Sequence, residues 1–223
     1  MPSVKIPRKS TATDMTPFVD VAFLILSFFM LATKFKPPEK VPIDPPGSVN
    51  SDQLPENDAV MISIDSAGRV FYSVLSQKDP ELKKEVVKQL NTLRTLNLTD
   101  QQMNSFMNVF AVGVPLANLG QYLSASKDEQ EKFVEPGIPV LDSATNELVW
   151  WINASQKAFS ERGGVKAQIL IKGDGRSKYP VFEGVVSALK RNEEFKYQLV
   201  TSLEGVPNGS ELEKFNAKKA KEK

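Results

Sequence analysis

The most apolar stretch of the chain reads MTPFVDVAFLILSFFMLAT, residues 15–33, and its only charged residue is Asp20. As an α-helix that rises ~1.5 Å per residue, this stretch would extend about 28 Å, close to the ~30 Å hydrocarbon thickness of a bilayer. The sequence therefore predicts one transmembrane helix, over residues 15–35.

Two other interpretations of this stretch start from Asp20 as its boundary. The uncharged remainder, residues 21–33, would then have the length of a buried helix or of the apolar region of a signal peptide. A cleaved signal peptide is disfavoured because no small-residue cleavage site precedes Lys34. A soluble core helix is disfavoured because residues 21–30 are apolar on every side apart from Ser27.

The charges that flank the predicted helix give its orientation. The short tail of residues 1–14 contains Lys5, Arg8 and Lys9, which favours a cytoplasmic N-terminus. The opposite flank is basic as well, with Lys34, Lys36 and Lys40, which weakens this charge bias.

Asp20 is the candidate functional residue. An ionised carboxylate on a spanning helix costs ~3 kcal/mol by insertion scales, so such acids usually face a partner or a water path. In one interpretation, Asp20 lies near the cytoplasmic interface and is hydrated by headgroup water. In the other, further helices surround Asp20, an apolar environment favours its neutral form, and it carries protons under the membrane potential.

The overall composition excludes several other functions. The 28 basic and 27 acidic residues leave a net charge of +1, and no basic patch with interleaved aromatic residues points to nucleic acid. The absence of cysteine and histidine excludes disulfides, Cys/His metal sites and Ser-His or Cys-His nucleophile pairs. No spaced pair of acids indicates a hydrolase. We therefore expect no enzyme activity, no cofactor and no bound metal.

The remainder of the chain divides into a linker, a domain and a tail. Residues 36–58 are rich in proline and predict an extended periplasmic linker, or equally a simple disordered spacer. Residues 59–205 predict an α+β domain of two layers, with helices on one face of a small sheet. Residues 77–142 within it would be a helical insertion, and residues 206–223 a flexible C-terminal tail.

Local patterns place the elements of this domain. Alternating apolar residues around Ser66-Ala67-Gly68 predict a hairpin over residues 59–74. Apolar residues at helical spacing predict helices that begin near Pro80, after Thr99 and beyond Pro115, and a further one from about Ser143 to Gly163. Thr99 and Gln102 form a capping-box pattern. A strand, a helix and a closing strand should end the domain.

Five segments resemble the ExbD/TolR family. The first is DMTPFVDVAFLILSFFM, residues 14–30, which is similar to the membrane helix of that family. The others are VPIDPP at 41–46, QILIKGD at 168–174, YPVFEGVVSALK at 179–190 and YQLVT at 197–201. The resemblance thus covers the first and last thirds of the chain, whereas the middle third matches nothing in the family pattern.

This resemblance implies a function and a location. The essential aspartate of the family falls on Asp20, as a proton-carrying residue. The chain would be a single-pass protein of the bacterial inner membrane, with its N-terminus in the cytoplasm and its domain in the periplasm. A homodimer would place two helices inside a ring of ExbB- or TolQ-like subunits and pass energy to a TonB- or TolA-like transducer.

Two functions are compatible with this resemblance. The first is a stator or motor subunit that is coupled to the proton motive force and energises TonB-dependent transport across the outer membrane. The alternative is a passive, membrane-tethered periplasmic module that binds cell wall or a protein partner.

Overall fold

The computed structural model describes residues 15–32, 41–49, 54–55, 57–76, 79–164 and 166–205. The chain forms two compact units, Met1–Glu39 and Lys40–Lys223. Among the described residues, the first unit contains helix α1 and the second contains the other helices and the strands. The predicted tails, residues 1–14 and 206–223, lie outside the described residues.

Helix α1 covers Thr16–Ala32, 17 residues. It is shorter than the predicted span of residues 15–35, because Met15 precedes its first turn and residues 33–35 lie outside the described ranges. Judged by length and hydropathy together, none of the helices in the described ranges could cross a membrane.

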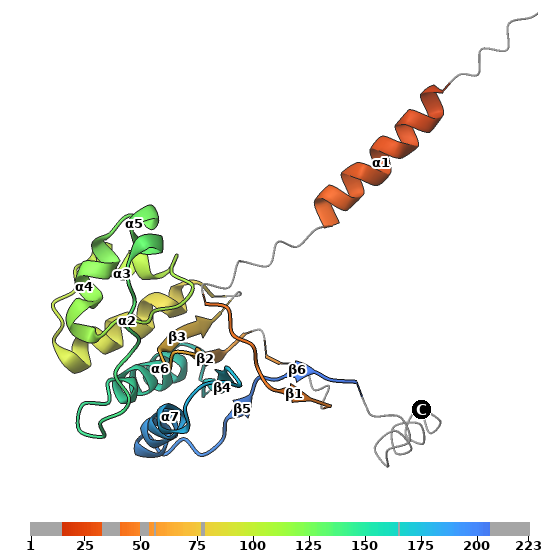
Figure 1. Cartoon of the computed structure of the whole chain (residues 1–223). Helices are drawn as coiled ribbons and strands as arrows, with labels where there is room; N and C mark the ends of the chain where they lie inside the picture. The colour runs from red at the N-terminus through yellow and green to blue at the C-terminus, as the bar shows by residue number, and fades with distance from the viewer. Residues whose placement is uncertain are drawn as a thin grey trace, which may run out of the picture. The chain divides into compact units, whose positions relative to one another are not determined.

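A four-stranded mixed sheet in the order β3-β2-β4-β5 forms the centre of the second unit (Figure 1). β2 and β3 are antiparallel, whereas β4 lies parallel to both β2 and β5. The predicted hairpin is confirmed, and Gly68 in its turn adopts φ of 82° while its N–H donates to the Asp65 carbonyl oxygen. The strands are β2 Ala59–Ile64, β3 Val70–Leu75, β4 Gln168–Gly173 and β5 Gln198–Leu199.

Six helices accompany the strands in the described part of this unit. The capping box of Thr99 and Gln102 is present, as predicted. The short helix α5 was not expected, since its sequence KDEQEK has no apolar periodicity. The bounds are α2 Glu81–Arg94, α3 Asp100–Phe106, α4 Leu116–Ser124, α5 Lys127–Lys132, α6 Leu148–Gly163 and α7 Tyr179–Arg191.

The predicted start of the helix at about Ser143 is wrong, because α6 begins at Leu148. Two polar side chains take the backbone donors of the preceding turn. The Asp142 carboxylate accepts from Ala144 N–H, and the Asn146 side-chain oxygen accepts from Leu148 N–H. Such local side-chain bonds compete with helix formation and delay its first turn.

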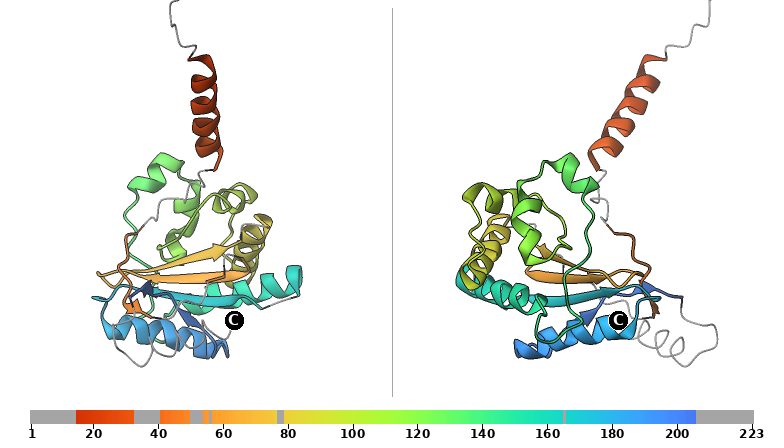
Figure 2. Two further views of the ribbon diagram at one scale, coloured as in Figure 1. Left: turned by 90° about the vertical axis from the view of Figure 1, so that its right-hand side faces the viewer. Right: turned by 60° about the vertical axis from the view of Figure 1, so that its left-hand side comes forward.

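The core lies between one face of the sheet and three helices. Alternate strand residues such as Val60, Ile62 and Ile171 share one apolar cluster with residues of α2, α6 and α7. In this layer α6 contacts both α2 and α7 (Figure 2). The two-layer α+β architecture agrees with the prediction, and α2 is part of the main helix layer. Within the predicted insertion of residues 77–142, only the segment after α2 is therefore additional.

The segment after α2 covers one edge of the sheet. α3 packs on both α2 and α4. The chain then returns along β3, where Val112 pairs with Tyr72 and Ile138 N–H donates to the Val70 carbonyl oxygen. These contacts satisfy backbone groups that an open edge strand would leave exposed.

The predicted linker is docked on the domain where the structure describes it. β1 Gly47–Ser48 pairs in parallel with β6 Ser202–Leu203. The predicted closing strand is therefore divided into two. Gln198–Leu199 pairs with the main sheet, whereas Ser202–Leu203 forms hydrogen bonds with residues 46–48. Within the predicted linker of residues 36–58, the part over residues 41–49 is therefore attached to the domain and does not act as a spacer.

Gly137 provides a test of this packing. Its φ of 94° disfavours any side chain, and an added Cβ would lie 2.9 Å from the Val70 nitrogen. We expect Gly137→Ala to lower the free energy of unfolding by more than ~2 kcal/mol, measured by chemical denaturation. The matched control is Gly173→Ala, whose Cβ would meet nothing within 4 Å. An equal loss in both variants would contradict this account.

Candidate functional site

Asp20 lies in the second turn of α1 and is exposed. A shallow hollow on this side of the helix is lined by Met15, Thr16, Val19, Asp20 and Phe23. Apart from Asp20, the helix from Thr16 to Ala32 contains no charged side chain. The carboxylate is thus the one charge on this apolar helix.

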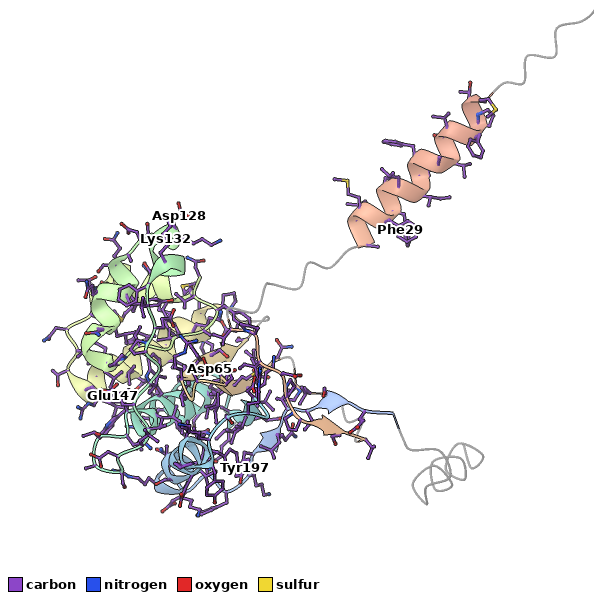
Figure 3. The ribbon with its side chains drawn as sticks, viewed as in Figure 1. Phe29, Asp65, Asp128, Lys132, Glu147 and Tyr197 are labelled. Carbon is purple, nitrogen blue, oxygen red and sulfur yellow. The ribbon has the colours of Figure 1, made fainter. Side chains whose placement is uncertain are left out.

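The apolar side chains of α1, among them the labelled Phe29, project from several sides of the helix in Figure 3. The large ones are 52% to 87% exposed. They are Phe18, Val19, Val21, Phe23, Leu24, Ile25, Leu26, Phe28, Phe29, Met30 and Leu31, and Met15 directly before the helix is equally exposed. Each would gain roughly 1.5–3 kcal/mol on leaving water. The helix as a whole is therefore suited to an apolar environment or to apolar partner helices on every side.

This arrangement can support one simple kind of chemistry. A carboxyl group can exist as a charged or a neutral species, and an apolar environment makes the difference between the two energetically large. Binding or losing a proton at Asp20 would therefore change how the helix interacts with its environment. Among the described residues, no three His, Cys, Asp or Glu side chains come close enough to hold a metal ion.

A second polar site lies in the domain, at Asp174, directly after β4. Asp174 is 4% exposed, and its Oδ1 accepts from both the backbone N–H and the Nε of Arg176. Its Oδ2 accepts from Asp44 N–H at 3.2 Å, and Gly175 N–H donates to the Asp44 carbonyl oxygen at 3.0 Å. Asp174 thus attaches residues 41–49 to the domain.

The hydrogen bonds from the backbone N–H of Arg176 and then of Asp44 lower the pKa of Asp174. A lowered pKa in the folded state means that this group stabilises the docked segment above its unfolded pKa, about 3.9. That stabilisation is lost as the pH falls through the lower, folded-state pKa. We expect the protection factors of the Asp44 and Gly175 amides, which correct for the intrinsic pH dependence of exchange, to fall below about pH 4 for this reason.

Asp174→Asn should produce the same release at neutral pH. The amide has one acceptor oxygen, so its NH2 group would face either the Asp44 or the Arg176 donor. Exchange over residues 41–49 should rise, while exchange in β2 and β4 stays unchanged. Asp142→Asn is the matched control, because its carboxylate is exposed and bonds only within its own turn. Unchanged exchange in Asp174→Asn would contradict the assigned role.

Sequence reasoning singled out Asp20, whose role stays a prediction, but it missed the role of Asp174. The glycines of the turn after β4 drew attention to backbone geometry, whereas the partner of Asp174 is 130 residues away in the sequence. The one local signal is the Asp-x-Arg spacing, since Arg176 contributes two of the donors to Asp174. No sequence pattern marked Asp44 as its partner.

A comparison with protein families places this sequence in a class of transport proteins. The family model that matches is that of the biopolymer transport protein ExbD/TolR, and the match covers residues 7–204. The chain therefore belongs to the ExbD/TolR family, whose members are transport-associated proteins that work with membrane partners. No curated protein and no solved structure matches the chain significantly.

Proposed function

We propose that this chain is a subunit of an inner-membrane motor of the ExbB–ExbD type, which couples the proton motive force to TonB-dependent transport across the outer membrane. The observation that carries the proposal is Asp20, the single charge on a helix whose large apolar side chains are exposed. Membership of the ExbD/TolR family supports it.

The cost of an ionised carboxylate in the membrane and the energy that the membrane potential supplies are of comparable size. An ionised carboxylate within a membrane costs ~3 kcal/mol by insertion scales. A potential of 100 mV supplies ~2.3 kcal/mol for each charge that crosses it. The potential is therefore large enough to bias the switch between neutral and ionised Asp20.

The partners in the proposed assembly come from the resemblance to the ExbD/TolR family, and its membrane environment from the exposed apolar side chains of α1. Residues 15–35 lie in the inner membrane, the N-terminus in the cytoplasm and the α+β domain in the periplasm. α1 itself, at 17 residues, is about 26 Å long, which is shorter than the ~30 Å hydrocarbon core of a bilayer. Local thinning of the bilayer or surrounding partner helices compensate for this mismatch in length. Two copies of the chain present their helices to a ring of ExbB- or TolQ-like subunits, and a TonB- or TolA-like protein receives the energy.

The test is proton flux through the assembled complex. The chain and its ExbB-like partner are reconstituted in vesicles that contain a pH-sensitive dye, and a membrane potential is imposed. We expect flux from the wild-type complex and none from the complex with Asp20→Asn. Equal flux from both complexes would overturn the proposal. If the protein remains functional in cells although its complex conducts no protons, the alternative function, a passive, membrane-tethered binding module, would be favoured.

A further inference from the structure

The polar side chains of α1 lie on one face of the helix. At 3.6 residues per turn, Thr16, Asp20 and Ser27 fall within about 40° of one another around the helix axis. They are the only residues of α1 with polar side chains. Without a shared role, three polar side chains would be expected at unrelated angles around the helix axis.

Ser27 lies about 10 Å from Asp20 along this face, towards the C-terminal end of the helix. It is also the one residue of α1 that is half-buried rather than exposed. Its hydroxyl group donates to the Leu24 carbonyl oxygen at 2.9 Å. Because a hydroxyl oxygen has two lone pairs, this bond leaves the Ser27 oxygen able to accept from a water molecule.

A proton that approaches Asp20 from the C-terminal end of α1 has to pass the level of Ser27. From Val21 to Met30, Ser27 is the only residue with a polar side chain. Any water molecule between the helix and an apolar partner needs polar groups to hold it. On this face, the Ser27 hydroxyl is the group that can do so.

We propose that Ser27 is a positioning residue, whose hydroxyl holds the water through which protons reach Asp20 from the C-terminal end of α1. The inference rests on the proposed function and adds a second residue to its proton path. Ser27 itself is chemically unchanged, because the proton travels through the water and binds only at Asp20.

The test is proton flux through the reconstituted complex of the full chain and its ExbB-like partner, normalised to the amount of assembled complex. Ser27→Ala and Ser27→Val should each lower the flux about fivefold, the factor that corresponds to one lost hydrogen bond. Ser27→Thr, which retains a hydroxyl group and has the shape of Val, should restore most of it.

A double variant controls for composition. Ala22 lies about 140° around the helix from Ser27, so Ser27→Ala combined with Ala22→Ser moves the hydroxyl group to another face. We expect no recovery of flux. Full recovery, or equal flux in the Val and Thr variants, would overturn the role of Ser27.

These outcomes separate the inference from the proposal on which it rests. If Asp20→Asn stops the flux while Ser27→Val does not, only the role of Ser27 fails. If Asp20→Asn leaves the flux intact, the proposed function fails and the role of Ser27 fails with it.

Discussion

Cells whose only copy of this chain contains Asp20→Asn are expected to lose all transport that depends on the proton motive force. Asn has nearly the shape of a protonated aspartate but cannot release a proton, so the helix should insert and pack normally. The expected loss is at least 100-fold, as for removal of an essential proton-transfer group. The measurement is uptake of a substrate that needs energised transport, with copurification of the partner subunits as the control for assembly.

The position of the carboxyl group on the helix provides a sharper control. Asp20→Asn combined with Ala22→Asp returns a carboxyl group to α1 but places it about 160° away around the axis. If the face matters, this double variant should remain inactive although it restores the charge. Activity in Asp20→Asn, or in the double variant, would show that proton transfer at position 20 is not required.

The elements that sequence patterns predicted are those whose causes are local. The hairpin around Gly68 depends on a turn within three residues, and the start of α3 depends on the reciprocal bonds of Thr99 and Gln102. The choice of Asp20 as the candidate residue rests on equally local evidence, the apolar residues on either side of it, and its role stays a prediction. A short window of sequence contains all the information that these predictions require.

The features that sequence patterns missed depend on distant partners. β1 and β6 are two residues each, and they pair across more than 150 residues of sequence. Neither segment has an apolar alternation long enough to predict a strand. The bond between Asp44 and Asp174 is missed for the same reason, because no local pattern links a proline-rich segment to a turn at the far end of the domain.

Trp151→Ala is expected to cause the largest loss of stability in the domain. The indole ring is fully buried, with its centroid 4.6 Å from the ring of Tyr72 and 5.9 Å from that of Phe106. Truncation would leave a large cavity between the sheet and α6. We expect a loss of about 3–5 kcal/mol in the free energy of unfolding. Chemical denaturation of the unit Lys40–Lys223, followed by circular dichroism, measures it.

Trp151→Phe should cost far less than its change in volume suggests. Within the described structure, the buried Nε1 of Trp151 has no hydrogen-bond partner. A buried, unsatisfied donor of this kind costs ~1–3 kcal/mol. Phe removes that donor and retains an aromatic ring between Tyr72 and Phe106, so the gain offsets much of the lost packing. The expected net loss is below about 1.5 kcal/mol.

Trp150 is the matched control, because it adjoins Trp151 on the same helix but is only partly buried. Its ring lies 4.9 Å below the Arg94 guanidinium, a contact worth ~0.5–1 kcal/mol at an exposed site. Trp150→Ala should therefore cost much less than Trp151→Ala. If Trp151→Phe were as costly as Trp151→Ala, the fit of the whole indole would decide the stability, and the unsatisfied donor would be of no consequence.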